Sequence, residues 1–400
     1  MTSKCNISKI CKQAFWLRVS LLLLIYLLQD QLGIYFMPSN VFHDDDKYII
    51  GAKAYAEAAN SLFDWQAFIS SMATVGHYAE INDENGWFVF TSIFMYIFHS
   101  EWILRLFNIG FAVVSINLLY KLALRVFDMK VALTSAKMLA FLPYPVLFCC
   151  FPFKDQFVMM LLLSSLLIIH KLANENTLLV KRIFLLILLI TVIHFTRQGL
   201  DVLILLLAVI YYFSRNIVKA KKSCVIWIII IVCIGAIYCG NSLYEDVLYK
   251  LNSYLGSRDY SESRILSLIS IDSVYDIWKF PMSYAFSLLL PFDLNQPWNT
   301  WYGLISSLNI IMFPFAISNV LYLFKKKDDI SFYFGLLAFY LAVIVMSATI
   351  FRHYYCLLPI SILFFAKYWT YTSRRSKQFV MIISFMSVSY THLRAHETTL

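Results

Sequence analysis

Long apolar segments, roughly eleven of them, follow one another along almost the whole chain and are separated by short loops. A bilayer core about 30 Å thick needs roughly 20 apolar residues for each crossing helix, and these segments have that length. Only 14% of the residues are charged and 60% are hydrophobic, whereas a soluble chain carries about 25% charged residues. The pattern therefore predicts an all-α fold, a polytopic transmembrane helical bundle of about 10–11 spans, as a single membrane domain over residues 1–389.

The charges in the loops predict the orientation of this bundle. The first apolar run, from Ala14 to Met37, is longer than a signal-peptide core and no small-residue cleavage site follows it, so we expect a retained anchor. Basic residues precede this run and recur in every second loop, which places the N-terminus and these loops in the cytoplasm. The net charge of +9 then reflects topology rather than nucleic-acid binding, and we expect a bacterial cytoplasmic membrane. The basic residues are Lys4, Lys9, Lys12, Arg18, Lys121, Arg125, Lys130, Lys171, Lys181, Arg182, Arg215, Lys219, Lys221, Lys222, Lys325, Lys326, Lys327, Arg374, Arg375 and Lys377.

The remaining polar segments fall on the opposite, outer face. The first of them carries eight acidic residues against Lys47 and Lys53, and apolar residues recur in it at helical spacing. That spacing predicts an amphipathic helix in the membrane interface, through Tyr55, Ala58, Leu62, Trp65, Ile69 and Met72. The next stretch, 87–98, is apolar but too short to span, which favours a re-entrant or interfacial piece. The five outer segments are 38–86, 151–156, 194–199, 241–301 and 351–355.

Three adjacent carboxylates, Asp44, Asp45 and Asp46, follow the first apolar run directly. Like charges repel one another, and nearness to lipid raises the cost of each charge. One interpretation is a general base, or an electrostatic partner for a substrate, at the interface. The alternative is a topological or solubilising acidic turn. A divalent cation is possible here because hard cations take carboxylate oxygens, but the sequence offers no recognised metal-binding loop.

Three cations, Lys154, Arg197 and Arg352, each end an apolar run on the face that should be poor in cations. Arginine suits bidentate contact with phosphate and lysine acts as a point charge, so together they predict a site for an anionic headgroup. Each one alone is also explained by snorkelling to the interface or by pairing with Asp155 or Asp201. Flanking residues complete the candidate set: His353 beside Arg352, Asp155 and Asp201 as orienting groups, and Tyr354 and Trp298 to line a sugar or lipid groove or to form part of an interfacial belt.

Several of these segments resemble a known family. Asp45-Asp46-Lys47-Tyr48, followed by Ala52-Lys53-Ala54, resembles the first outer loop of the GT-C superfamily of membrane glycosyltransferases, and of its protein mannosyltransferase-like and related bacterial branches in particular. The stretch Trp102–Phe127 and the later Ala140-Phe141-Leu142-Pro143, leading to Lys154-Asp155, are also similar to that family. So is Arg352 before a tyrosine-rich segment and Pro359. The acidic pair is Asp-Asp rather than the commoner Asp-Glu, so the register of the base stays open among the three aspartates.

The resemblance implies an enzyme that uses a polyprenyl-phosphate-linked sugar as donor and a lipid, glycan or protein as acceptor at the outer face. The donor phosphate would contact Lys154, Arg197 or Arg352, and a carboxylate of the triplet, Asp45 by preference, would activate the acceptor hydroxyl. No nucleotide and no covalent enzyme intermediate are implied.

Two other functions remain as alternatives. A polysaccharide polymerase or ligase that joins lipid-linked repeat units would also have many spans, and would use the long segment 241–301. A lipid or glycan flippase or transporter should place charges at mid-membrane and show repeated halves, neither of which the sequence indicates. Residues 390–400 resemble a translated sequencing-adapter tail, and we expect them to be non-native.

Overall fold

The computed structural model describes residues 2–33, 43–74, 85–175, 178–197, 200–216, 355–397 and a few positions between 314 and 321. Helices account for 89% of the described residues, and no strand occurs among them. Four helical segments there are long and apolar enough to cross a membrane: Ile7–Gln31, Glu101–Val126, Asp155–Asn174 and Leu179–Thr196. The predicted all-α class and membrane character are therefore confirmed. The full number of spans stays a prediction.

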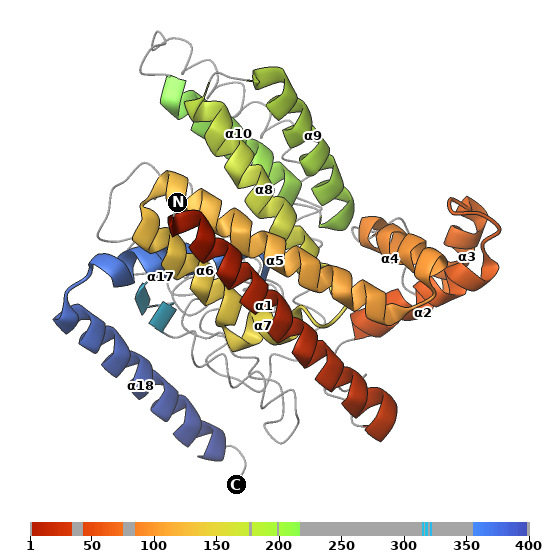
Figure 1. Ribbon diagram of the computed structural model, residues 1–400, viewed down its shortest axis with the longest axis horizontal. Helices are drawn as coiled ribbons and strands as arrows, with labels where there is room; N and C mark the ends of the chain where they lie inside the picture. The colour runs from red at the N-terminus through yellow and green to blue at the C-terminus, as the bar shows by residue number, and fades with distance from the viewer. Residues whose placement is uncertain are drawn as a thin grey trace, which may run out of the picture.

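Helix α5 (Glu101–Val126) lies at the centre of the described bundle (Figure 1). It packs against α6 (Met129–Phe141) and α8 (Asp155–Asn174), while α1 (Thr2–Tyr26) runs across the face that α5 and α6 form. Helices α9 (Leu179–Thr196) and α10 (Leu200–Asn216) pack on α8, and α17 (Leu358–Tyr371) packs on α6. The last helix, α18 (Arg374–Glu397), continues through residues 390–397, which leaves the prediction about the tail untested.

The first span begins earlier than expected, at Ile7 rather than Ala14, and α1 ends in a π-helical turn, η1 (Leu27–Gln31). Lys9, Lys12 and Arg18 all lie inside this candidate span, and the Arg18 side chain is buried against α6. The prediction that these three residues precede the first span was wrong. The length of an apolar run does not show whether a charged side chain inside it has polar partners. With such partners, a buried guanidinium can remain within a span.

Those partners are backbone carbonyls at the end of α6. Pro143 begins the short helix α7 (Pro143–Phe148) and has no N–H to donate to Leu139, four residues earlier. The Arg18 guanidinium supplies the missing donors: Nη2 lies 3.1 Å from the Leu139 oxygen, and Nη1 lies 2.8 Å from the Ala140 oxygen. Arg18 thus caps the C-terminal end of α6. The chain from Leu142 to Lys154 then forms α7 and the turn that precedes α8.

The segment predicted to be the first outer loop, together with the apolar stretch after it, contains three helices where one amphipathic helix and a short apolar piece were expected: α2 (His43–Ala58), α3 (Trp65–Thr74) and α4 (Asn85–Phe98). The break between α2 and α3 arises because Asp64 Oδ1 accepts from the Ala67 N–H at 3.0 Å and so caps α3. The Tyr55 hydroxyl fixes the same turn by donating to the Leu62 oxygen at 2.8 Å. The predicted apolar stripe divides accordingly: Tyr55 is buried, whereas Trp65 is 66% exposed.

Candidate functional site

The turn before α8 is held from α4 and α5 by side chains that bond its carbonyl groups. Asn108 of α5 donates through Nδ2 to the oxygens of Phe151 and Phe153, at 2.5 and 3.0 Å. Trp87 of α4 donates through Nε1 to the Pro152 oxygen at 3.1 Å. Buried carbonyls need such partners, and here three in succession are satisfied by side chains rather than by secondary structure. The start of α8 is therefore fixed in position by residues remote in sequence.

A buried ion pair stands at this start. Asp155 is the first residue of α8, and its Oδ1 lies 2.8 Å from Nη1 of Arg197, which ends α9. The two side chains are 2% and 12% exposed, and the neighbouring Lys154 is buried as well. A carboxylate in the first turn of a helix is favoured by the helix dipole. Lys154, Asp155 and Arg197 thus form a group of buried charged residues at the end of the α8–α9 pair.

A second polar group, Gln156, adjoins the ion pair and contacts two further elements. Its Oε1 accepts from the Tyr355 hydroxyl at 2.7 Å, and its Nε2 lies 3.4 Å from Oγ of Ser115 on α5. Tyr355 is fully buried against Phe148 and Tyr144. Tyr355 is the last residue of the predicted outer segment 351–355, so the end of that segment lies in the cluster.

The α9–α10 turn carries a third polar contact. Nδ1 of His194, in the last turn of α9, lies 2.8 Å from Oδ2 of Asp201, in the first turn of α10. The His194 side chain is 51% exposed and that of Asp201 is 12% exposed. His194 and Arg197 stand three residues apart in the sequence, at the end of α9.

The first outer loop adjoins this polar cluster through α4. Tyr48 of α2 belongs to one buried apolar cluster with Trp87, whose ring also packs 5.6 Å from that of Phe157 on α8. Gly86 of α4 meets Phe195 of α9 so closely that a Cβ would lie 2.8 Å from the Phe195 oxygen. The residues of the acidic triplet lie at the start of α2, before Tyr48. The side chains of Asp44, Asp45 and Asp46 lie outside the described residues.

The structure thus brings together three of the predicted site residues, Lys154, Asp155 and Arg197. Asp201 adjoins them but pairs with His194 rather than with Arg197. Arg352, His353, Tyr354 and Trp298 lie outside the described residues, as does most of the segment 241–301. Asn108, Gln156 and His194 were not among the predicted site residues, whereas Tyr355 lies in the predicted outer segment 351–355. Gln156 and His194 each lie in a predicted outer segment, close to a predicted site residue. That proximity was the sequence signal that could have identified them.

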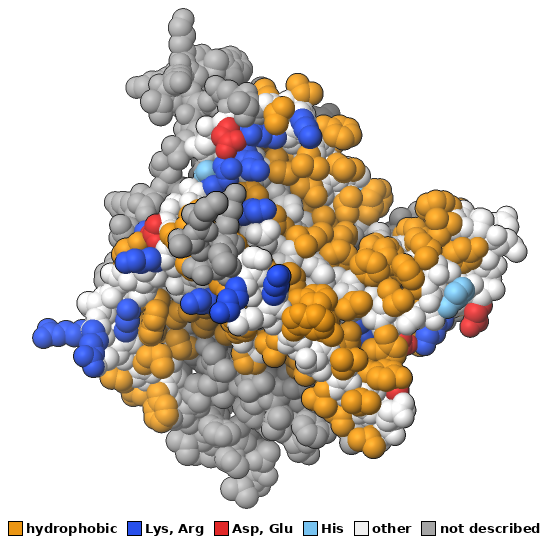
Figure 2. Space-filling model, viewed as in Figure 1, with side chains coloured by type: hydrophobic (Ala, Val, Ile, Leu, Met, Phe, Trp, Pro, Cys, Tyr) orange, Lys and Arg blue, Asp and Glu red, His pale blue; other side chains and the backbone are white. Residues whose placement is uncertain are grey.

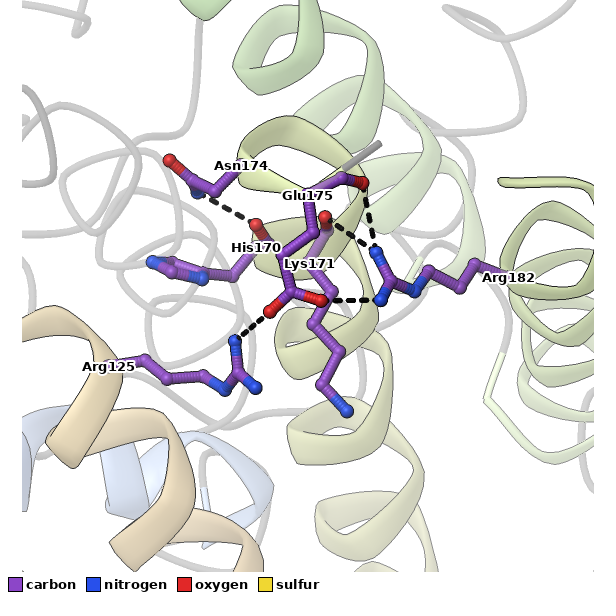
Figure 3. A network of polar contacts seen from close by, with 6 residues as sticks. All are labelled: Arg125, His170, Lys171, Asn174, Glu175 and Arg182. Atoms are coloured by element: carbon purple, nitrogen blue, oxygen red, sulfur yellow. Dashed lines mark hydrogen bonds and ion pairs between the residues drawn. The ribbon is translucent and has the colours of Figure 1, made fainter. Parts of the chain in front are cut away.

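A different polar network closes the opposite end of α8, roughly 30 Å away along its 20 residues (Figure 3). Glu175 follows α8 and accepts from Nη1 of Arg125 at 2.5 Å through Oε1, while its Oε2 pairs with Arg182 of α9. The Arg125 hydrogen bond, together with Arg182, holds the pKa of the Glu175 carboxyl below its usual value. Arg182 also donates to the backbone oxygens of Lys171 and Glu175. Both arginines use their hydrogen bonds to join helix ends, which is a structural role.

The two ends of α8 differ in their surroundings. Most Lys and Arg side chains on the face in Figure 2 gather toward the side where α1 begins, and hydrophobic side chains cover much of the rest. That side also holds the start of α9 and the α17–α18 junction (Figure 1), both in segments predicted to be cytoplasmic. The predicted orientation and the alternation of the loops stay a prediction.

Within the described part of the chain, no group of three or more His, Cys, Asp or Glu side chains is arranged to hold a metal ion. The side chains of the acidic triplet lie outside the described residues, so the divalent cation stays a prediction. No family model, curated protein or solved structure matches this chain.

Proposed function

We propose that this protein is an integral membrane glycosyltransferase that moves a sugar from a polyprenyl-phosphate donor to a lipid, glycan or protein acceptor at the outer face of the cytoplasmic membrane. The observation that carries the proposal is the buried cluster of Lys154, Asp155 and Arg197 at the end of the α8–α9 pair. Cations held at the ends of spans suit a lipid-linked phosphate, because the lipid can lie along the helices while its charge stays at the boundary. The resemblance of the first outer loop to GT-C enzymes supplies the reaction type.

The proposed chemistry divides between two groups of residues. Lys154 and Arg197, with Arg352 and His353 from the segment before Tyr355, bind the donor phosphate and stabilise the charge that grows on it as the sugar departs. Asp155 orients Arg197 for this contact. A carboxylate of the triplet, Asp45 by preference, takes the proton of the acceptor hydroxyl as that oxygen attacks the anomeric carbon. Contacts through Tyr48 and Trp87 connect the helix of the triplet to the turn that bears Lys154.

The deciding experiment is mass spectrometry of lipid-linked sugars in a bacterial strain that lacks the protein. Accumulated polyprenyl-phosphate monosaccharide supports the proposal and identifies the sugar. Accumulated polyprenyl-pyrophosphate repeat units contradict it and favour a polysaccharide polymerase or ligase, in which case the acidic triplet is a structural turn.

Complementation of that strain tests the residues. We expect Asp45→Asn to abolish transfer while the protein still inserts, and Glu57→Gln to leave transfer unchanged, since Glu57 is an exposed acid on the same helix. We expect Arg352→Ala to weaken binding of the lipid phosphate. Full activity of the Asp45 variant removes the proposed base, and unchanged affinity of the Arg352 variant removes that residue from the phosphate site.

One observation favours a flippase or transporter as the second candidate. Arg18 lies within a candidate span and caps α6 where that helix breaks, and charged residues with broken helices inside a membrane are typical of transport pathways. A transporter predicts that the lipid-linked sugar accumulates on the inner leaflet only. A transferase predicts that it is accessible from outside.

A further inference from the structure

Helix α1 has one buried face and one exposed face. The buried residues recur every three or four positions, as in a helix that packs on one side only: Ile7, Ile10, Ala14, Arg18, Leu22 and Ile25. They face α5 and α6, on which α1 packs. The exposed residues Lys9, Lys12, Trp16, Leu23 and, in η1, Leu27 form what we call the outward face. Along the helix this face changes from charged to aromatic to apolar.

The charged part of the outward face lines an open depression. Its volume is about 610 Å³, within the range of roughly 300–1,000 Å³ that small-molecule sites have. Its lining residues are Ser8, Lys9, Lys12, Gln13 and Trp16. All five side chains carry a group that can donate a hydrogen bond, and Trp16 is 64% exposed. The depression therefore offers donors and positive charge next to an exposed aromatic ring.

The two lysines of this depression lie inside the candidate span Ile7–Gln31, where a cation needs a polar partner. Among the ion pairs that the described residues form, none includes Lys9 or Lys12. A further exposed cation, Lys121 of α5, acts electrostatically on Cys11, which lies between the two lysines in the sequence. Positive charge thus gathers at this end of the span, which favours an anion as the partner.

We propose that the outward face of α1 binds one anionic phospholipid. Its phosphate lies at Lys9 and Lys12, and an acyl chain runs along Leu23 and Leu27. Trp16 lies between these two parts, at the depth where an indole N–H can donate to the ester groups of a lipid. Basic residues beside the end of a span attract anionic lipids in this way.

The whole length of the outward face argues for this occupant. A soluble anion would use the two lysines but would leave the apolar part of the face without a partner. A zwitterionic lipid would bring a quaternary ammonium group close to two cations, which repel it. The site shares no residue with the cluster of Lys154, Asp155 and Arg197, so it does not depend on the proposed reaction.

Tryptophan fluorescence of the full chain in phosphatidylcholine nanodiscs tests this. The probe is phosphatidylglycerol with bromine atoms on its acyl chains, because bromine quenches an indole that it contacts. The Trp16 signal is the difference between the protein and its Trp16→Phe variant. We expect brominated phosphatidylglycerol to quench this signal at mole fractions well below those that brominated phosphatidylcholine requires.

Removal of the lysines should abolish this preference. Each lysine near the membrane surface contributes about fivefold to the affinity for an anionic lipid. Lys9→Gln and Lys12→Gln should therefore each raise the mole fraction needed for quenching by about fivefold. The double variant should respond alike to the two brominated lipids. Lys9→Arg should keep the preference, since arginine also binds phosphate.

Lys181→Gln is the matched control, because Lys181 is an exposed lysine in the first turn of α9. It removes the same charge from the start of another candidate span, and quenching of Trp16 should not change. Thermal unfolding of each variant verifies that it is folded.

Three outcomes would overturn the lipid site. One is equal quenching of Trp16 by the two brominated lipids in the wild type. Another is a loss in Lys181→Gln as large as that in Lys9→Gln, because the preference would then come from the charge of the whole surface. The third is displacement of the lipid by inorganic phosphate at constant ionic strength, which would assign the depression to a soluble anion. A loss confined to the Lys9 and Lys12 variants supports the site, whatever the lipid-linked sugars of the deletion strain show about the reaction.

Discussion

Arg197 and Asp155 form a buried ion pair with Nη1 and Oδ1 2.8 Å apart, which joins the end of α9 to the first residue of α8. The two residues are 42 positions apart in the chain. Because both are largely shielded from water, each needs its partner more than either half of an exposed pair does. The same two residues thus fix the geometry of the candidate phosphate site and the packing of the helices that carry it.

Removing one partner should therefore be costly. We expect Asp155→Asn to lower the free energy of unfolding by about 3–5 kcal/mol, because the Arg197 guanidinium loses its buried counter-charge. The double variant with Arg197→Gln should be less destabilised than the sum of the two single variants, by roughly 1–3 kcal/mol. Unfolding in mixed micelles measures both quantities.

The matched control is the more exposed pair of Lys53 with Glu101, 2.8 Å apart, in which the lysine side chain is 53% exposed. Lys53→Gln should change the free energy of unfolding by about 1 kcal/mol or less. An equal cost for the two pairs would contradict the view that burial makes the Asp155 pair important.

Arg18 provides a test of the broken helix. Arg18→Met should leave the oxygens of Leu139 and Ala140 without their donors, at a cost of about 1–3 kcal/mol for each group. Pro143→Ala restores an N–H four residues after Leu139, so in that background the same change at Arg18 should cost less. Purely additive effects in this double-mutant cycle, again measured by unfolding in micelles, would mean that Arg18 does not replace the donor that proline lacks.

Local sequence signals predicted the elements well and their partners poorly. Apolar length and charge predicted the helical class and the polar boundary at Lys154-Asp155, because these depend on neighbouring residues alone. The partners of Arg18, Arg197 and Tyr355 lie 122, 42 and 199 positions away, and no spacing rule identifies them.

The break in the first outer loop shows a different cause of error. Apolar residues at helical spacing predicted one helix across it, although Asp64 is a residue type that favours helix starts. The apolar period continued in register across the turn and so concealed the cap. Where periodicity and capping signals conflicted, the capping residue decided the backbone.

Gly86 allows α4 to approach α9. We expect Gly86→Ala to destabilise the protein by about 1–3 kcal/mol, because its Cβ would lie 2.8 Å from the Phe195 backbone oxygen and neither helix can yield cheaply. Gly110→Ala is the control: nothing lies within 4 Å of its Cβ, and alanine in a helix interior should stabilise by up to about 1 kcal/mol. Thermal unfolding of the two variants should therefore shift in opposite directions, and a neutral Gly86 variant would disprove the close approach of α4 to α9.

The Glu175 network at the other end of α8 should make stability depend on acid. Hydrogen bonds from Arg125 and then Arg182 hold the pKa of the Glu175 carboxyl below its ordinary value of about 4.3. A group whose pKa is lowered on folding stabilises the protein fully above its unfolded pKa, and that stabilisation is lost as the pH falls through the folded pKa. The wild type should thus exceed Glu175→Gln in melting temperature at pH 7, and the difference should shrink as the pH falls below about 4. A difference that stays constant from pH 7 to pH 3 would show that the glutamate acts through its shape and hydrogen bonds rather than through its charge.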